Sequence, residues 1–335
     1  MIYKYDGFIP EQTSPKNTKS IGVYDGSGNK IYTIPLGRLK QPTKEKLYSF
    51  GLLSDVHIQP YNANIGGIIS TKFENALRWF EQQCASFVCV SGDFVNRGFV
   101  NSSGTFTTDE FTEYKRICDM FPNLPVYVAC GNHESYHETI TNRLTELKYY
   151  TGADLCYTIS QGNDLFVFIG QPSGTVVMSD ADFQWLQETL ANNQDKRCFV
   201  FVHSYIEEDS GDAKDLRENS IFDDDCWGAT KRNAFMNLLK QYDNVILFHG
   251  HSHIKFEFQE LDKCANYTEK NGFKSVHIPS LGMPRNIDLA NSETPNMDYE
   301  GQGYIVDVYA DCIVLNGMDL VNNKYVPTGV FKIDI

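Results

Sequence analysis

Short runs of apolar residues, bounded by turn residues, recur along the chain. Five of them, rich in Val, Ile, Leu, Phe and Cys, occupy residues 47–54, 87–92, 126–131, 198–202 and 245–250. Runs of this length and composition are typical of buried strands in a largely parallel sheet. Helices are expected at residues 72–83, 181–190 and 229–241. The alternation of such strands with helices predicts an α/β fold with the helices on the outside of a sheet.

The two ends of the chain do not follow this alternation of strands and helices. Residues 1–46 are rich in Lys, Thr, Gly and Pro, and two alternating segments around Gly-Ser-Gly-Asn predict a hairpin at 21–24 and 30–34. We therefore expect an N-terminal extension over 1–46 and one domain over 47–335, which includes a long loop insertion at about 204–228. Alternating segments predict a mainly strand, antiparallel C-terminal part, at 254–261, 276–278, 304–309, 312–315 and 330–335.

Composition narrows the class of protein. The chain has 335 residues and a formal net charge of −14, which argues against a general polyanion binder, although bound metal ions would invert the charge locally. Nine cysteines without a Cys-x-x-Cys pair are interpreted as reduced, packed thiols. The chain starts without a signal-peptide pattern, and no apolar run approaches the roughly twenty residues that cross a bilayer. A soluble, cytoplasmic protein is expected.

Each of the five predicted strands ends at residues able to hold a metal ion. These residues are Asp55, His57, Asp93, Asn132, His203, His251 and His253. In open α/β sheets, side chains just past the carboxyl ends of strands converge on one crevice, so the seven are expected to meet. Two divalent ions fit this donor set, the first on Asp55, His57 and His253 and the second on Asn132, His203 and His251, with Asp93 as a bridge. The nucleophile would then be a hydroxide between the metals, because metal binding lowers the pKa of water.

The ordered motifs resemble a known family. The pieces Asp55-x-His57, Gly92-Asp93-x-x-Asn96-Arg97, Gly131-Asn132-His133-Glu134, His203 and Gly250-His251-x-His253 resemble the five motifs of the calcineurin-like metallophosphoesterase superfamily. This resemblance implies a four-layer α-β-β-α sandwich of two mixed sheets. It also implies that His133 protonates the leaving oxygen and that Arg97 and Asn132 hold the phosphate. Glu134 is expected to form a structural hydrogen bond near the site.

One position departs from a branch of that family. The protein phosphatase branch has Asp where this chain has Asn96, and a neutral amide orients the acid histidine without stabilising its charged form as well. The resemblance therefore favours a hydrolase of small-molecule phosphate esters, a phosphodiesterase or a phosphomonoesterase. The alternatives are a nuclease of the same superfamily, which the acidic charge disfavours, and a non-catalytic metal-binding scaffold.

The donor set leaves the identity of the metals open, because His, Asp and Asn suit Mn, Fe, Zn, Co and Ni. The partner predicted by these motifs is a small-molecule phosphate ester. Neither nucleic acid nor a membrane is expected as a partner, and the sequence carries no signal for an oligomeric state.

Overall fold

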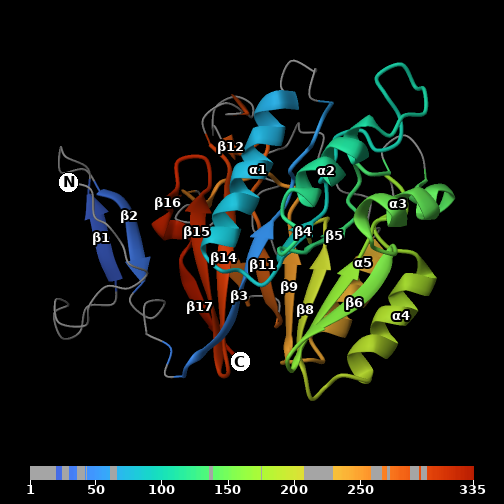
Figure 1. Ribbon diagram of the computed structural model, residues 1–335. Coiled ribbons are helices and arrows are strands. Elements are labelled where there is room, and N and C mark those ends of the chain that lie inside the picture. The colour runs from blue at the N-terminus through green and yellow to red at the C-terminus, as the bar shows by residue number, and fades with distance from the viewer. Residues whose placement is uncertain are drawn as a thin grey trace.

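Two β-sheets lie face to face between two layers of helices (Figure 1). The computed structural model of the chain describes residues 20–24, 30–35, 42, 44–60, 66–135, 139–174, 176–206, 229–257, 266–269, 272–286, 294–295 and 300–335. Because both sheets contain parallel and antiparallel neighbours, the fold is a four-layer α-β-β-α sandwich of mixed sheets. The predicted fold class is confirmed.

The first sheet has the strand order β16-β15-β14-β3-β4-β5, with β17 paired to β15. Its strands are β3 (Lys46–Leu53), β4 (Val88–Ser91), β5 (Val126–Ala129), β14 (Gln302–Tyr309), β15 (Cys312–Asp319), β16 (Lys324–Tyr325) and β17 (Phe331–Asp334). The second sheet has the order β10-β11-β9-β8-β7-β6. Its strands are β6 (Cys156–Gln161), β7 (Asp164–Ile169), β8 (Arg197–Val202), β9 (Val245–His249), β10 (Tyr267–Thr268) and β11 (Lys274–His277).

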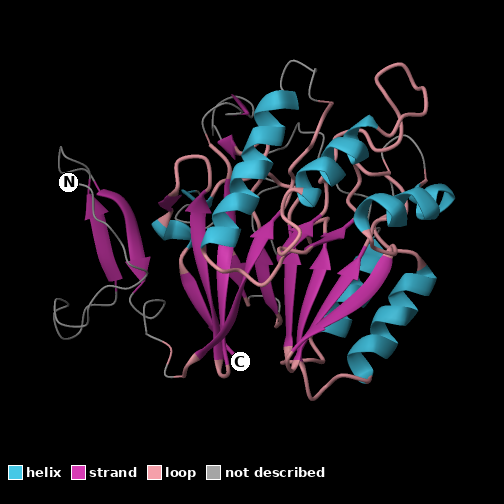
Figure 2. Ribbon diagram, in the orientation of Figure 1, coloured by secondary structure: helices cyan, strands magenta, loops and turns pink. Residues whose placement is uncertain are grey.

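The helices cover the outer faces of the two sheets (Figure 2). They are α1 (Gly66–Gln82), α2 (Asp109–Asp119), α3 (Leu144–Thr151), α4 (Asp180–Ala191) and α5 (Ala229–Leu239), with short 3-10 turns η3 (Ile140–Arg143) and η6 (Pro327–Gly329). Two small antiparallel pairs complete the described elements, β1 (Ser20–Tyr24) with β2 (Lys30–Pro35) and β12 (Arg285–Asn286) with β13 (Thr294–Pro295). The pair β1–β2 stands where the sequence predicts a hairpin.

The alternation of side chains along each strand builds three hydrophobic layers. On β7, Phe166 and Phe168 enter the core between the sheets, whereas Val167 faces the outer core under α4 and α5. The inner rings continue from strand to strand, because Phe168 stacks on Phe201 at 4.7 Å and Phe201 stacks on Phe248 at 5.1 Å. A third core lies between the first sheet and helices α1, α2 and α3. The two sheets are thus held at a fixed spacing, which places their strand ends side by side.

The five strands predicted from apolar runs are all present, as β3, β4, β5, β8 and β9, and the three predicted helices are α1, α4 and α5. Helices α2 and α3 and strands β6 and β7 were not predicted. The C-terminal part is antiparallel at β14, β15 and β17, but β11, which lies between β10 and β9 in the second sheet, pairs parallel with β9. The segment 254–261 begins with a single bridge at Ile254 and a turn, not a strand, over its described part.

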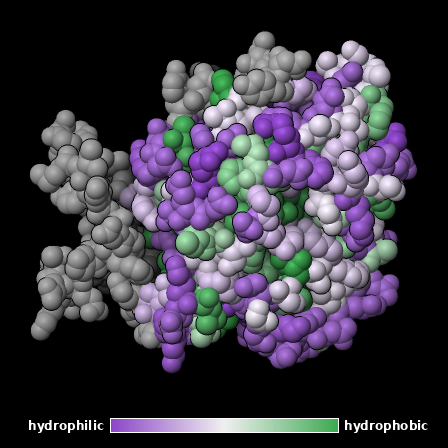
Figure 3. Space-filling model, viewed as in Figure 1, coloured by the Kyte–Doolittle hydropathy of each residue, from purple (hydrophilic) through white to green (hydrophobic). Residues whose placement is uncertain are grey.

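Residues 207–228 of the predicted loop insertion lie outside the described residues. No described helix has the length and apolar character needed to cross a membrane. The seven cysteines within the described part of the chain are free thiols, and Cys89, Cys130 and Cys198 are buried. The face of the molecule in Figure 3 is mostly hydrophilic, with hydrophobic side chains in small separate groups.

Candidate metal centre

The carboxyl ends of parallel strands from both sheets meet at one edge of the sandwich (Figure 1). The first sheet delivers Asp55 and His57 after β3, Asp93 after β4, and Asn132 and His133 after β5. The second sheet delivers His203 after β8, and His251 and His253 after β9. The expected convergence of strand ends is therefore what the structure shows, with the two sheets contributing opposite walls of one site.

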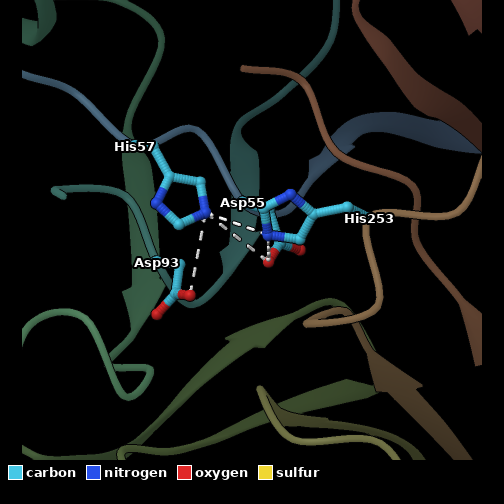
Figure 4. A group of neighbouring side chains, drawn as sticks. All are labelled: Asp55, His57, Asp93 and His253. Carbon is cyan, nitrogen blue, oxygen red and sulfur yellow. Dashed lines mark hydrogen bonds and ion pairs between the residues drawn. The ribbon is translucent and has the colours of Figure 1, made fainter. Parts of the chain in front are cut away.

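The side chains form two groups that share a carboxylate. In the first group, Asp55, His57, Asp93 and His253 each offer one ligand atom, and these atoms all lie within 4.8 Å of one another (Figure 4). In the second group, the same criterion joins Asp93, His203 and His251. Two neighbouring clusters with a common carboxylate are the arrangement that a pair of metal ions requires.

The chemistry of the rings fits a cation in each group. His253 Nδ1 donates to the carbonyl of Met283 at 3.0 Å, so its other nitrogen, Nε2, presents a lone pair. That Nε2 lies 3.1 Å from His57 Nε2. In the second group, His203 Nδ1 donates to the Ser91 carbonyl at 2.7 Å, and His203 Nε2 lies 3.2 Å from a ring nitrogen of His251. Ring nitrogens at these separations are close enough to bind one shared positive ion.

Two buried oxygens support the same conclusion. Asn132 Oδ1 is buried without a hydrogen-bond partner among the described residues, and the buried Asp55 Oδ1 lies 3.1 Å from His253 Nε2. Asn132 stands between Gly131, where an added Cβ would lie 2.3 Å from Asp93 Oδ1, and His133, whose N–H donates to Asp93 Oδ1 at 2.9 Å. Buried polar oxygens are nearly always paired, so both atoms are candidates to bind a metal.

The electrostatics of the site favour positive charge. Burial opposes ionisation of Asp93, but His203 and His133 outweigh it and hold the pKa of Asp93 well below its usual range. Burial likewise opposes a charge on His203, yet Asp93 and Asp55 raise the pKa of His203 to about 10. Burial and the neighbouring His203 lower the pKa of His251 to about 3. The site therefore holds anionic carboxylates that attract a cation, beside an imidazole that stays neutral and able to bind one.

The backbone at the site is strained where it presents ligands. Five of the seven residues adopt positive φ: Asp55 (52°), His57 (57°), Asp93 (50°), His251 (69°) and His253 (61°). Asp and His occur in the left-handed region more often than most residues, but each such conformation costs on the order of 1–3 kcal/mol. Backbone hydrogen bonds hold them, for example from His57 N–H to the Asp93 carbonyl at 2.8 Å. Strain of this kind clusters at functional sites.

Glu134 fixes the turns behind the carboxylates, as expected of a residue with a structural hydrogen bond near the site. Its buried side chain accepts N–H groups from Asp93 (3.0 Å), Val95 (2.9 Å) and Gly131 (2.5 Å). Burial and the nearby Asp93 raise the pKa of Glu134 to about 8. The side chain thereby ties the end of β4 to the end of β5.

The side chain of His133 is partly exposed. Its side chain is 28% exposed, whereas those of His57, His203 and His253 are at most 5% exposed. His133 Nδ1 donates to the main-chain carbonyl of Asn96 at 2.6 Å, and Nε2 lies 3.9 Å from Asp93 Oδ2. The sequence predicts that the Asn96 side chain orients this histidine, but the contact comes from the backbone of Asn96. His133 is thus oriented at the rim of the site, where a ligand can reach it.

Arg97 lies beside the cluster in the sequence but is only half-buried in the fold. Its backbone N–H donates to Glu110 at 2.6 Å, and no described residue forms a side-chain hydrogen bond or ion pair with its guanidinium. Sequence reasoning did not identify Glu110 or Met283 as parts of the site. Met283 acts through its carbonyl, which leaves no signal in the sequence, and Glu110 lies on helix α2, which the sequence pattern did not predict.

The carboxyl group of Glu110 should make stability depend on pH. Burial raises the pKa of Glu110 from 4.5 to about 7, although N–H groups of Arg97 and Asn96 and the charge of Arg97 oppose the rise. An acid whose pKa is higher in the folded state stabilises the fold at low pH, and this stabilisation is lost as the pH rises from 4.5 to about 7. The loss amounts to at most about 3 kcal/mol.

Glu110→Gln should remove this dependence, because the amide does not titrate. We expect the difference in unfolding free energy between the variant and the unaltered protein to grow in favour of the variant from about pH 4.5 to pH 7. Urea denaturation at several pH values measures it. Glu113→Gln, on the same helix and paired with Arg116 at 2.8 Å, is the control. Parallel pH curves for the unaltered protein and Glu110→Gln would contradict the prediction.

Glycines let the strand ends approach the ligands. Gly92 has φ of +87°, and an added Cβ would lie 2.4 Å from the ring of His203. At Gly250 an added Cβ would lie 1.8 Å from Ser54 Oγ and 2.5 Å from Asp55 Oδ2. Contacts this short displace the neighbouring atom, so both positions require glycine for space, and Gly92 requires it for backbone conformation as well.

Gly92→Ala is therefore expected to displace His203 and to weaken metal binding by about 10- to 100-fold, the range seen when the support of a ligand is lost. Titration of the metal-free protein by calorimetry measures the effect. Gly162→Ala is the matched control, because Gly162 also has positive φ (+60°) and an added Cβ there would meet nothing within 4 Å. Equal metal affinities for the two variants would contradict the prediction that contact with His203 matters.

Comparison with known proteins identifies the same family as the motifs. The family model of the calcineurin-like phosphoesterases matches residues 48–255. None of the curated proteins matches the chain. Among solved structures, a dimetal phosphatase from Danio rerio has 15% identity and a TM-score of 0.55, over 87% of this chain and 99% of the phosphatase. GAP50, the anchor in the inner membrane complex of Plasmodium, has 12% identity and a TM-score of 0.55. The match covers 87% of this chain and 89% of GAP50. Both structures share the fold.

Proposed function

The chain belongs to the calcineurin-like phosphoesterase family, and we propose that it is a dinuclear-metal-dependent hydrolase of small-molecule phosphate esters. The observation that carries this proposal is the pair of ligand groups that share Asp93. In this proposal Asp55, His57 and His253 hold one ion. Asn132, His203 and His251 hold the other, and Asp93 contacts both.

When bound, two divalent ions supply an activated water as the nucleophile and positive charge that stabilises the phosphoryl oxygens in the transition state. The protein's own contribution is to fix the ligands in place. Main-chain carbonyls orient His203 and His253, and Glu134 holds the turns that carry Asp93 and Asn132. Positions fixed before the substrate arrives reduce the reorganisation needed during the reaction.

We assign the proton transfer to His133. Its ring is partly exposed, and its Nδ1–H is held by the Asn96 carbonyl, so Nε2 is the atom directed to the cluster. A protonated Nε2 can give its proton to the oxygen of the departing alcohol, a role that contributes about 10² to 10⁴ in rate. Arg97 and Asn132 are proposed to bind the phosphate oxygens, Arg97 with its half-buried guanidinium.

A small-molecule ester is favoured over a nucleic acid by the charge of the chain. The net charge of −14 opposes the long phosphate backbone of a polynucleotide, while two metal ions still attract a single phosphate group. Both phosphodiesters and phosphomonoesters fit the proposed chemistry. A cytoplasmic location stays a prediction from the sequence.

The proposal is tested by reconstitution and a substrate panel. Metal-free protein is loaded with Mn²⁺, Fe²⁺, Zn²⁺, Co²⁺ or Ni²⁺, and metal content is measured by mass spectrometry. Each form is then assayed with cyclic nucleotides, glycerophosphodiesters and aryl phosphomonoesters. We expect two ions per chain and hydrolysis of at least one ester class. A fully loaded protein that hydrolyses none of them would overturn the proposal.

A metal-binding scaffold is the second candidate, because the fold is shared with GAP50, which is described as an anchor. A scaffold needs no general acid, whereas this chain places an oriented, partly exposed histidine beside the cluster. Two bound metals without activity on the panel would favour the scaffold.

A further inference from the structure

Glu110 is a buried carboxylate outside the ligand groups that nevertheless connects to the site. It lies in the first turn of α2 and is 4% exposed. One of its oxygens, Oε2, accepts the N–H of Asn96 at 2.9 Å and the N–H of Arg97 at 2.6 Å. Charged acceptors form hydrogen bonds about twice as strong as neutral ones, so this carboxylate fixes the backbone at 96–97.

The same peptide unit contacts Glu110 at one end and His133 at the other. Its N–H belongs to Arg97 and donates to Glu110, while its C=O belongs to Asn96 and accepts from His133 Nδ1 at 2.6 Å. The bond is trans, as are all described peptide bonds, so the two groups point in opposite directions. Glu110, the peptide and His133 therefore form a continuous chain of hydrogen bonds.

We propose that Glu110 is a positioning residue for His133, acting through the Asn96–Arg97 peptide. This inference rests on the proposed role of His133 as the general acid. A negative charge at the N–H end polarises the peptide and makes its carbonyl a better acceptor, because hydrogen bonds in a chain strengthen one another. The stronger acceptor holds the Nδ1–H of His133 and so fixes the direction in which Nε2 points.

Burial of a carboxylate is costly, which makes the position of Glu110 informative. A neutral amide could accept the same two N–H groups with less desolvation. Burial raises the pKa of Glu110 to about 7, so the side chain is fully charged only above neutral pH. Kinetic tests of the charge are therefore made at about pH 8.5.

The test is a double-mutant cycle read with two substrates. Phenyl phosphate has a poor leaving group that needs a proton, whereas 2,4-dinitrophenyl phosphate has a good one that does not. If the protein hydrolyses only diesters, phosphodiesters with the same phenyl and 2,4-dinitrophenyl leaving groups replace these two monoesters. We expect Glu110→Gln to lower kcat for the phenyl ester by about tenfold, with less than about twofold change for the dinitrophenyl ester or in KM. In a His133→Asn background, Glu110→Gln should change kcat by less than about twofold.

A spectroscopic measurement tests the contact without activity. In the metal-loaded protein, we expect the Nδ1–H proton of His133 to move upfield in the NMR spectrum of Glu110→Gln, because its acceptor weakens. Glu113→Gln is the control in both experiments, since Glu113 lies on the same helix and pairs with Arg116. Folding of Glu110→Gln is checked by near-ultraviolet circular dichroism.

The outcomes separate the two proposals. Equal effects of Glu110→Gln on both esters, additive effects in the cycle, or an unmoved Nδ1–H resonance would overturn the role of Glu110. If His133→Asn lowers kcat equally for the phenyl and the dinitrophenyl ester, then the acid role of His133 is wrong. The NMR shift alone then decides whether Glu110 positions the imidazole.

Discussion

Replacing Asp93 by asparagine is expected to abolish the dinuclear site and lower kcat/KM by about 10³-fold or more. Asp93 is the carboxylate common to both ligand groups, and its Oδ2 lies 3.0 Å from His203 Nε2. An amide in its place loses the negative charge that both ions require, and loss of one preorganised polar contact alone costs about 10² to 10³ in rate. Metal analysis and steady-state kinetics measure the two consequences separately.

The backbone should tolerate this substitution. Asp93 has φ of 50°, and Asn adopts this region as readily as Asp does. The amide oxygen can still accept the N–H of His133, which Asp93 Oδ1 accepts at 2.9 Å. Asp154→Asn, at an exposed carboxylate that pairs with Lys148, controls for the loss of one charge. An Asp93→Asn variant that keeps two metals and activity within tenfold would contradict the bridging role.

The positions of the candidate ligands could be predicted because strand geometry determines them. An apolar run indicates a buried strand, and the residue after the carboxyl end of that strand must lie at the edge of the sheet. Asp55, Asp93 and His203 each follow such a strand directly or by one residue. What the sequence could not give is the distance between the two sheets, which the layer of phenylalanine rings on β7, β8 and β9 determines.

The unpredicted elements lack the signals on which sequence reasoning depends. Helix α3 buries only Leu147, so it has no apolar stripe at helical spacing. Strand β7 is buried throughout, but Gly170 and Gln171 follow it, and neither residue suggests a metal ligand. Main-chain acceptors cannot be predicted from the sequence either, because the carbonyls of Met283 and Asn96 accept hydrogen bonds whatever side chains these residues carry.

The strained conformations connect the fold to the proposed chemistry. Five ligand residues with positive φ together store several kcal/mol of strain. If metal ions bind as proposed, the free energy of binding offsets this strain. A protein that already holds its ligands in this geometry loses less conformational entropy when the ions bind.

Replacing His133 by asparagine is expected to slow the hydrolysis of phenyl phosphate, or of the matching diester, by about 10² to 10⁴. The same change should slow hydrolysis of the 2,4-dinitrophenyl ester by less than about tenfold, because a stable leaving anion needs no proton. Metal content should not change, since His133 belongs to neither ligand group. Steady-state kinetics with both esters measure the rates, and metal analysis of the same preparation measures the metal content.

The ratio of the two losses is what distinguishes an acid from a residue that binds the phosphate. A residue that contacts phosphate oxygens lowers the rate for both esters alike, because the transferred group is the same. Arg97→Met is therefore the matched comparison, since Arg97 is the candidate for phosphate binding and lies in the loop after β4, next to the Asn96 carbonyl that holds His133. Similar losses with both esters for His133→Asn would place His133 with Arg97, and the proton would have to come from elsewhere. A loss confined to the phenyl ester requires that the 28% exposed imidazole, held by the Asn96 carbonyl, delivers the proton.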